Sequence, residues 1–295
     1  KKIAADYTGK YNDPIVALLN GGEATGFVNV LNAIESAATD DKIKGITLLN
    51  NQSMIGMAQM KELREALDNF KKSGKFIVSY ADFYSQREYY LGSVADTVYI
   101  NPIGELDLKG LSTEIMFYKN LQEKSGIKME VLRHGQFKSA VEPFLDDKMS
   151  EANRLQTSTL LNSVWSDMVA DISKSRKISV QQIDAIATDL LARTPEMAKS
   201  QKLIDKIAYE DEFHAGIKAA LKVSKDKEYN KVSIAEYAQK VGNTITKGDA
   251  PTDKVAIIYA QGEIKSGKGD PTYIGEGAMR KALKDAREDK NVKSI

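Results

Sequence analysis

Cysteine is absent from this 295-residue chain, and histidine occurs only twice. The missing thiols exclude disulfides, thiolate metal ligands and a cysteine nucleophile. Two histidines are too few for a zinc site built on several imidazoles, and we expect neither a metal nor another cofactor. A chain without disulfides is permitted in an oxidising envelope compartment but gives no evidence for one.

The chain also lacks an excess of one charge and any long apolar run. Its 42 lysines and arginines against 41 acidic residues give a net charge of +1, so nothing favours nucleic acid as a partner. No apolar run approaches the roughly 20 residues that a membrane-spanning helix needs. Because the sequence starts at Lys1 rather than at a methionine, any signal or anchor segment is expected to lie outside it.

The residues that are present have an ordinary globular composition, with 42% hydrophobic and 28% charged. Apolar residues recur at helical spacing over 27–38 and 57–70, and short apolar strands follow at 43–49 and 76–80. Helices that alternate with strands at this pace predict parallel βαβ units. The predicted fold class is therefore α/β.

Later segments continue the helical pattern. Ser150 is a good N-cap for a long helix whose apolar stripe is expected to run from Leu155 to Ile172. Further helices are predicted at 180–192 and 211–223, and a helix over 86–94 precedes the central part of the chain.

An internal repeat relates the two ends of the chain. Residues 29–46 recur at 278–295, with Lys44 and Lys293 249 positions apart. Two unrelated amphipathic helices could give a similar pattern, but a strand-like run, Lys254–Ala260, also precedes the second occurrence. The residues that recur unchanged are Ala33, Ala37, Asp40, Lys44 and Ile46, as Ala282, Ala286, Asp289, Lys293 and Ile295.

The repeat predicts how the chain is divided. Residues 1–223 form a first α/β repeat, the polar segment 224–253 is a linker, and 254–295 begin a second repeat. The sequence ends inside the strand that Ile43–Leu49 completes in the first copy. We therefore expect the second copy to be truncated.

The candidate catalytic residue is Lys138, in the run Arg133–Phe144. A strand-like segment, Lys128–Leu132, leads into this run, and Pro143 opposes a regular helix within it. Apolar neighbours such as Phe137 can desolvate an amine and disfavour its charged form, and a neutral amine can activate a serine as general base. The alternative is an ordinary lysine whose stem lies on apolar surface with its charge in water.

The run Phe-Lys-Ser-Ala-Val-Glu-Pro-Phe at residues 137–144 resembles the lysine motif of the long bacterial signal peptide peptidases, also called protease IV. In that family the lysine is the general base of a Ser-Lys dyad, and the resemblance carries this role over to Lys138. The likeness covers most of the chain and includes Tyr84–Gln86, Tyr89–Leu91, Ala95–Asp96, Asn101–Pro102 and Gly104.

The resemblance implies a Clp/crotonase-like fold, a spiral of ββα units present in two tandem copies. It also implies that the first copy supplies the lysine and the second the serine, in an Ala-Ser-Gly-Gly-Tyr pattern preceded by an Asn-Ser-Pro-Gly-Gly loop. Neither pattern occurs here, where the matching segments read Ser85–Tyr90 and Asn51–Gly56. Aligning the tyrosines puts Gln86 at the serine position, so we expect this chain to be inactive by itself.

By the same resemblance, the whole protein is a serine endopeptidase that degrades cleaved signal peptides. The family implies a homotetramer in the bacterial cell envelope, on the inner membrane and facing the periplasm. The membrane anchor is expected in a segment outside this chain.

Alternatives at the site stay open. Ser85 is a possible nucleophile within one copy, but no glycine pair follows it, which favours a helix N-cap completed by Glu88. Ser139 is better explained by a structural role, and His134 by an exposed loop. The segment Gly262–Gly269 resembles a phosphate-binding loop but lacks the final serine or threonine, which favours an ordinary loop.

Two other functions compete with the peptidase. The first is a catalytically inactive Clp/crotonase-like scaffold that binds peptides or subunits. The second is a crotonase-type acyl-CoA enzyme, which needs paired backbone amides to hold a thioester oxyanion.

Overall fold

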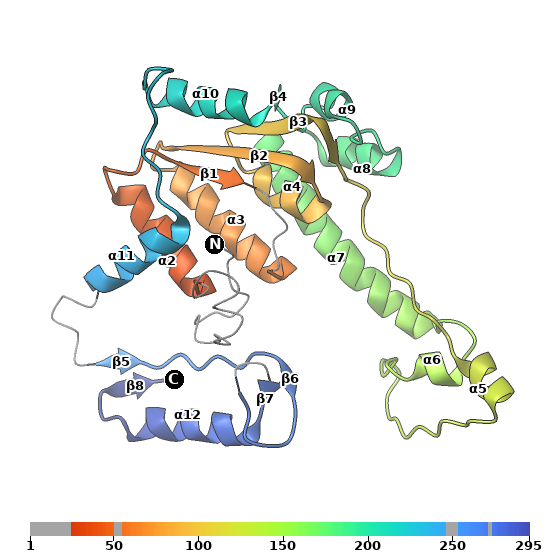
Figure 1. Ribbon diagram of the computed structural model, residues 1–295. Coiled ribbons are helices and arrows are strands. Elements are labelled where there is room, and N and C mark those ends of the chain that lie inside the picture. Colours follow the sequence, from red (N-terminus) through yellow and green to blue (C-terminus); the bar gives the residue numbers. More distant parts are fainter. Residues whose placement is uncertain (1–24, 50–54, 246–252, 271–272) are drawn as a thin grey trace.

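The computed structural model describes residues 25–49, 55–245, 253–270 and 273–295 (Figure 1). Its main body is built on a four-stranded sheet in which each strand pairs in parallel with the next. The predicted α/β class with a parallel sheet is thus confirmed. In sheet order the strands are β1 (Gly45–Leu49), β2 (Phe76–Tyr84), β3 (Thr97–Leu106) and β4 (Lys206–Ile207).

Helices cover both faces of this sheet (Figure 1). Alternate strand residues explain the two layers, because successive side chains of a strand point to opposite faces. Ile77 and Val98 belong to the larger core, whereas Val78 and Tyr99 pack with Phe213 on the other side. On the first face lie α2 (Phe27–Thr39), α3 (Met57–Lys71), α4 (Gln86–Gly92) and α7 (Glu151–Arg176), and on the second α10 (Glu210–Ala220).

The helix ends follow the capping residues in the sequence. Ser150 accepts a hydrogen bond from the backbone N–H of Asn153 at 3.2 Å and so starts α7 as predicted. Gly74 adopts a left-handed φ of +79° after α3, where its N–H donates to the carbonyl of Lys71. Two shorter helices, α8 (Val180–Thr188) and α9 (Pro195–Ser200), follow α7.

A buried arginine joins three of these helices. Arg64 of α3 is 3% exposed and donates to Ser93 Oγ at 2.9 Å, to the carbonyl of Asp171 at 2.9 Å and to Ser175 Oγ at 2.6 Å. It also donates to the carbonyl of Tyr90 and lies 4.8 Å from the centre of that ring. Burial lowers the pKa of Arg64. The guanidinium therefore fixes α3 against α4 and α7.

Residues 111–160 form an arm that extends from the main body along the first half of α7 (Figure 1). It carries α5 (Lys119–Ser125) and α6 (Glu142–Leu145) near its far end. Leu155 and Leu160 are 62% and 63% exposed, so the prediction of one apolar stripe packed along all of α7 is wrong for its first half.

The strand-like run Lys128–Leu132 is also corrected by the structure, since no strand forms there. A strand is stabilised by hydrogen bonds to a neighbouring strand, and Leu132 is fully exposed on the arm. The alternating apolar pattern alone was therefore not sufficient to predict a strand.

Part of the predicted linker 224–253 is a packed helix, α11 (Ile234–Ile245), which lies against α2. The hydroxyl of Tyr237 donates to Asp40 Oδ2 at 2.9 Å, and Ala235 and Ala238 are buried. The polar composition of the segment hid this apolar face. The other boundaries of the three-part division stay a prediction.

The C-terminal residues repeat the helix and turn of the first copy. The bounds of α12 (Glu276–Glu288) coincide with those of α2 at the predicted offset. Asp40 and Asp289 end the two helices, and each carboxylate accepts the backbone N–H two residues later at 2.9 Å.

Short strands accompany α12. Only two residues of the expected buried strand Lys254–Ala260 form β5 (Lys254–Val255), and both are exposed. Among the described strands, β5 pairs only with β8 (Val292–Ser294), so the two form a two-stranded ribbon separate from the main sheet. The other pair is β6 (Glu263–Ile264) with β7 (Tyr273–Ile274). Across the described ranges, every helix is too short or too polar to span a bilayer.

Candidate functional site

Lys138 lies on the arm, in the loop between α5 and α6, and its side chain is exposed. Phe137 beside it is 50% exposed. The desolvation that the sequence led us to expect is therefore not provided by the residues that the structure describes.

Contacts between α5 and α6 hold the end of the arm. The rings of Tyr118 and Phe144 stack with centroids 5.6 Å apart. The backbone N–H of Tyr118 donates to the carbonyl of Pro143 at 2.6 Å, and Gln122 Nε2 donates to the carbonyl of Phe144 at 2.8 Å. These bonds fix the segment that directly follows Lys138.

The neighbours of Lys138 behave as structural or surface residues. The carbonyl of Ser139 accepts the N–H of Glu142 at 3.0 Å and shapes the turn into α6. His134 is exposed in the loop. Both observations agree with the expectations for these two residues.

Ser85 is the N-cap of α4 and forms the predicted capping box. Its Oγ accepts the N–H of Glu88 at 3.3 Å and donates to Glu88 Oε2 at 2.9 Å. Figure 1 places α4 in the main body and the loop between α5 and α6 at the far end of the arm. The structure therefore does not bring Ser85 and Lys138 together.

Gln86 occupies the position that the alignment of tyrosines assigns to the nucleophile. Its Oε1 accepts the N–H groups of Lys109 and Gly110, both at 3.0 Å, and its Nε2 donates to the carbonyl of Gly110 at 3.0 Å. The side chain of Gln86 thus holds the backbone at Lys109 and Gly110, directly before the arm begins. This role was not predicted, because its partners lie 23 and 24 positions away.

Two other predicted segments have clear outcomes. In the phosphate-loop-like segment 262–269, Gly267 N–H donates to Glu276 Oε2 at 2.7 Å and the carbonyl of Lys268 accepts Ala278 N–H at 2.5 Å. These bonds to the first turn of α12 agree with an ordinary loop. Of the segment aligned with the glycine loop, residues 51–54 lie outside the described residues.

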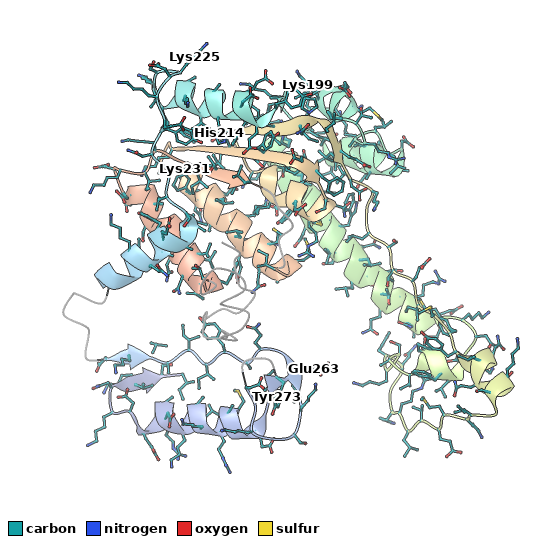
Figure 2. All side chains as sticks on the ribbon, viewed as in Figure 1. Lys199, His214, Lys225, Lys231, Glu263 and Tyr273 are labelled. Carbon is teal, nitrogen blue, oxygen red and sulfur yellow. The ribbon has the colours of Figure 1, made fainter. Side chains whose placement is uncertain are left out.

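A cavity of about 400 Å³ lies beside α10, on the main body and away from the arm. Figure 2 shows His214 there, with Lys225 and Lys231 nearby. His214 Nδ1 is hydrogen-bonded to the hydroxyl of Tyr229 at 2.7 Å, and Lys218 pairs with Glu228 at 3.3 Å. Charges of both signs line this cavity. Within the described ranges, no cluster of acidic or histidine side chains suits a metal ion.

The structure thus combines a parallel α/β body with a lysine motif on an exposed arm. The sequence profile of peptidase family S49 matches residues 69–224, which include β2, the arm and α10. This chain belongs to peptidase family S49. The resemblance to protease IV is thereby confirmed.

Curated relatives agree with this assignment. The chain is 30% identical over 275 residues to Protease 4 of Haemophilus influenzae, covering 90% of this chain and 45% of that protein. It is 32% identical over 280 residues to Protease 4 of Salmonella typhi, covering 90% and 44%. A plant relative, the chloroplastic serine protease SPPA of Arabidopsis thaliana, is 30% identical over 292 residues, covering 97% and 42%. The chain thus spans less than half the length of these relatives.

Similar solved structures include a peptidase from Plasmodium falciparum, 12% identical, with a TM-score of 0.37 over 62% of this chain and 89% of the other. An enoyl-CoA hydratase/isomerase family protein from Silicibacter pomeroyi is 11% identical, with a TM-score of 0.40 over 75% and 80%. Likenesses this weak carry no argument about the site.

Proposed function

We propose that this chain supplies the general base, Lys138, of a Ser-Lys peptidase whose serine comes from a second copy of the same α/β unit. The observation that carries the proposal is the contrast between the candidate base and the candidate nucleophiles of this chain. Lys138 is exposed on the arm, whereas Ser85 and Gln86 are engaged in a capping box and in backbone hydrogen bonds.

The lengths of the relatives support a two-copy protein. Each curated relative is more than twice as long as the part that this chain matches, and α12 begins a second occurrence of α2. We propose the division into a first repeat over 1–223, a connection over 224–253 that contains α11, and the start of a second repeat over 254–295.

In the proposed reaction, the neutral amine of Lys138 takes the proton from the serine hydroxyl. The serine oxygen attacks the scissile carbonyl, and the protonated Lys138 passes its proton to the leaving amine as the C–N bond breaks. The neutral lysine then takes a proton from water, which hydrolyses the acyl-enzyme and frees the serine. The second copy would cover the arm and exclude water from the lysine, because burial favours the neutral amine.

Cleaved signal peptides are the proposed substrates, since their apolar cores suit apolar subsites. The proposed whole protein is a homotetramer on the inner membrane of the bacterial cell envelope. It faces the periplasm and is anchored through a segment outside this chain.

The test compares this chain with the complete reading frame in the hydrolysis of an apolar peptide ester. We expect hydrolysis by the complete frame and none above background by this chain alone, because the nucleophile is missing from it. Hydrolysis by this chain would contradict the split site and return attention to Ser85. A folded but inactive complete frame would instead support the peptide-binding scaffold.

A further inference from the structure

Glu142 is a buried carboxylate in an arm whose residues are mostly exposed or half-buried. It is 2% exposed, although the loop residues 132–138 that precede it are all exposed. Ser150 Oγ donates to its Oε1 at 2.5 Å, and Asn153 Nδ2 donates to its Oε2 at 2.9 Å. The Ser150 N–H adds a third bond at 3.3 Å. Glu142 therefore ties α6 to the first turn of α7.

Arg133 extends this connection back to the lysine. Its Nη1 lies 3.9 Å from Glu142 Oε1 and donates to the carbonyl of Lys138 at 3.2 Å. The guanidinium thus bridges the buried carboxylate and the backbone of the proposed base. The lysine loop is thus connected to the start of α7 through Arg133 and Glu142.

The charge on Glu142 is maintained by its partners. Burial acts to raise the pKa of this carboxyl group, but the hydrogen bonds from Ser150 and Asn153, together with Arg133, hold the pKa below its usual range. A charged acceptor strengthens each of these hydrogen bonds relative to a neutral one.

We infer that Glu142, acting through Arg133, is the positioning residue for Lys138. The inference rests on the proposed function of Lys138 as general base. Glu142 does not touch the reacting atoms. It holds the loop so that the amine is presented in one place when the second copy covers it, and displacement of a catalytic group by about 1 Å can cost on the order of 10²-fold in rate.

The test uses Glu142→Gln in the complete reading frame. The amide can still accept one hydrogen bond but no longer attracts Arg133, so we expect kcat for the peptide ester to fall about 10- to 100-fold with KM little changed. Trypsin should cleave after Lys138 about tenfold faster, since the local opening that exposes the loop becomes easier. Glu142→Asp should restore part of kcat.

Two further variants complete the design. Glu130→Gln is the matched control, because Glu130 is an exposed glutamate of the same arm whose ion pair with Lys128, at 4.0 Å, is fully solvent-facing. It should leave kcat and cleavage unchanged. Arg133→Met tests the bridge even if Glu142→Gln fails to fold, since the bonds of Glu142 to α7 remain, and it should lower kcat to a similar extent.

The outcomes separate this inference from the function on which it rests. If Lys138→Ala keeps its activity, the proposed function fails and Glu142 positions no base. If Lys138→Ala is inactive while folded Glu142→Gln and Arg133→Met both keep the wild-type kcat and the wild-type cleavage after Lys138, only the inference about Glu142 is overturned.

Discussion

Replacing Lys138 by alanine in the complete reading frame is expected to lower kcat/KM for an apolar peptide ester by about 10²- to 10⁴-fold, the usual contribution of a general base. Alanine has no group that can take the serine proton. The side chain is exposed in this chain, so the same substitution in this chain alone opens no cavity and should leave its melting temperature nearly unchanged. Steady-state hydrolysis together with thermal unfolding checks both expectations.

Two matched substitutions make this result specific. Lys148→Ala removes another exposed lysine of the same arm and should retain full activity. Lys138→Arg keeps the positive charge but should be as inactive as alanine, because a guanidinium does not lose its proton in proteins. Activity of Lys138→Ala within a few-fold of the wild type would show that the base lies elsewhere.

Replacing Arg64 by alanine is expected to cause the largest loss of stability, about 3–5 kcal/mol, because unsatisfied buried acceptors each cost about 1–3 kcal/mol and a cavity adds to this. Arg64 donates to two backbone carbonyls and two hydroxyls on α4, α7 and the turn after α4. Alanine removes a donor from each of these buried acceptors, although the carbonyl of Tyr90 keeps its bond from Ser93 Oγ. Urea unfolding should show a much lower transition midpoint.

The control for this substitution is Arg154→Ala, since Arg154 lies exposed on the arm half of α7. It should change the free energy of unfolding by less than about 0.5 kcal/mol. Arg64→Lys should give an intermediate loss, because a single ammonium cannot replace a planar guanidinium that reaches four acceptors. A loss below about 1 kcal/mol for Arg64→Ala would contradict the role assigned to this buried junction.

Capping residues and the internal repeat predicted the positions of helices well. Ser85 and Ser150 start their helices as N-caps, and the repeat predicted where α12 lies from the position of α2. Packing between residues far apart in the chain could not be predicted from these signals. The period of α7 was visible, yet the exposure of Leu155 depends on which elements reach it. The Arg64 junction joins residues up to 111 positions apart, which no short pattern reveals.

The candidate site shows the same limit. A motif of eight residues was sufficient to single out Lys138, but its exposure depends on an arm whose position no motif encodes. The engagement of Gln86 with the backbone at Lys109 and Gly110 was likewise invisible, since glutamine has no capping pattern that predicts partners so far away. The buried state of Glu142 emerges only once α6 meets α7.

The most direct test of the account locates the nucleophile. The complete reading frame is treated with a fluorophosphonate, which labels activated serines, and the labelled peptide is identified by mass spectrometry. The split Ser-Lys site predicts a label on a serine outside residues 1–295, lost in Lys138→Ala and retained in Ser85→Ala. A label on Ser85, or on any other serine of this chain, would contradict it.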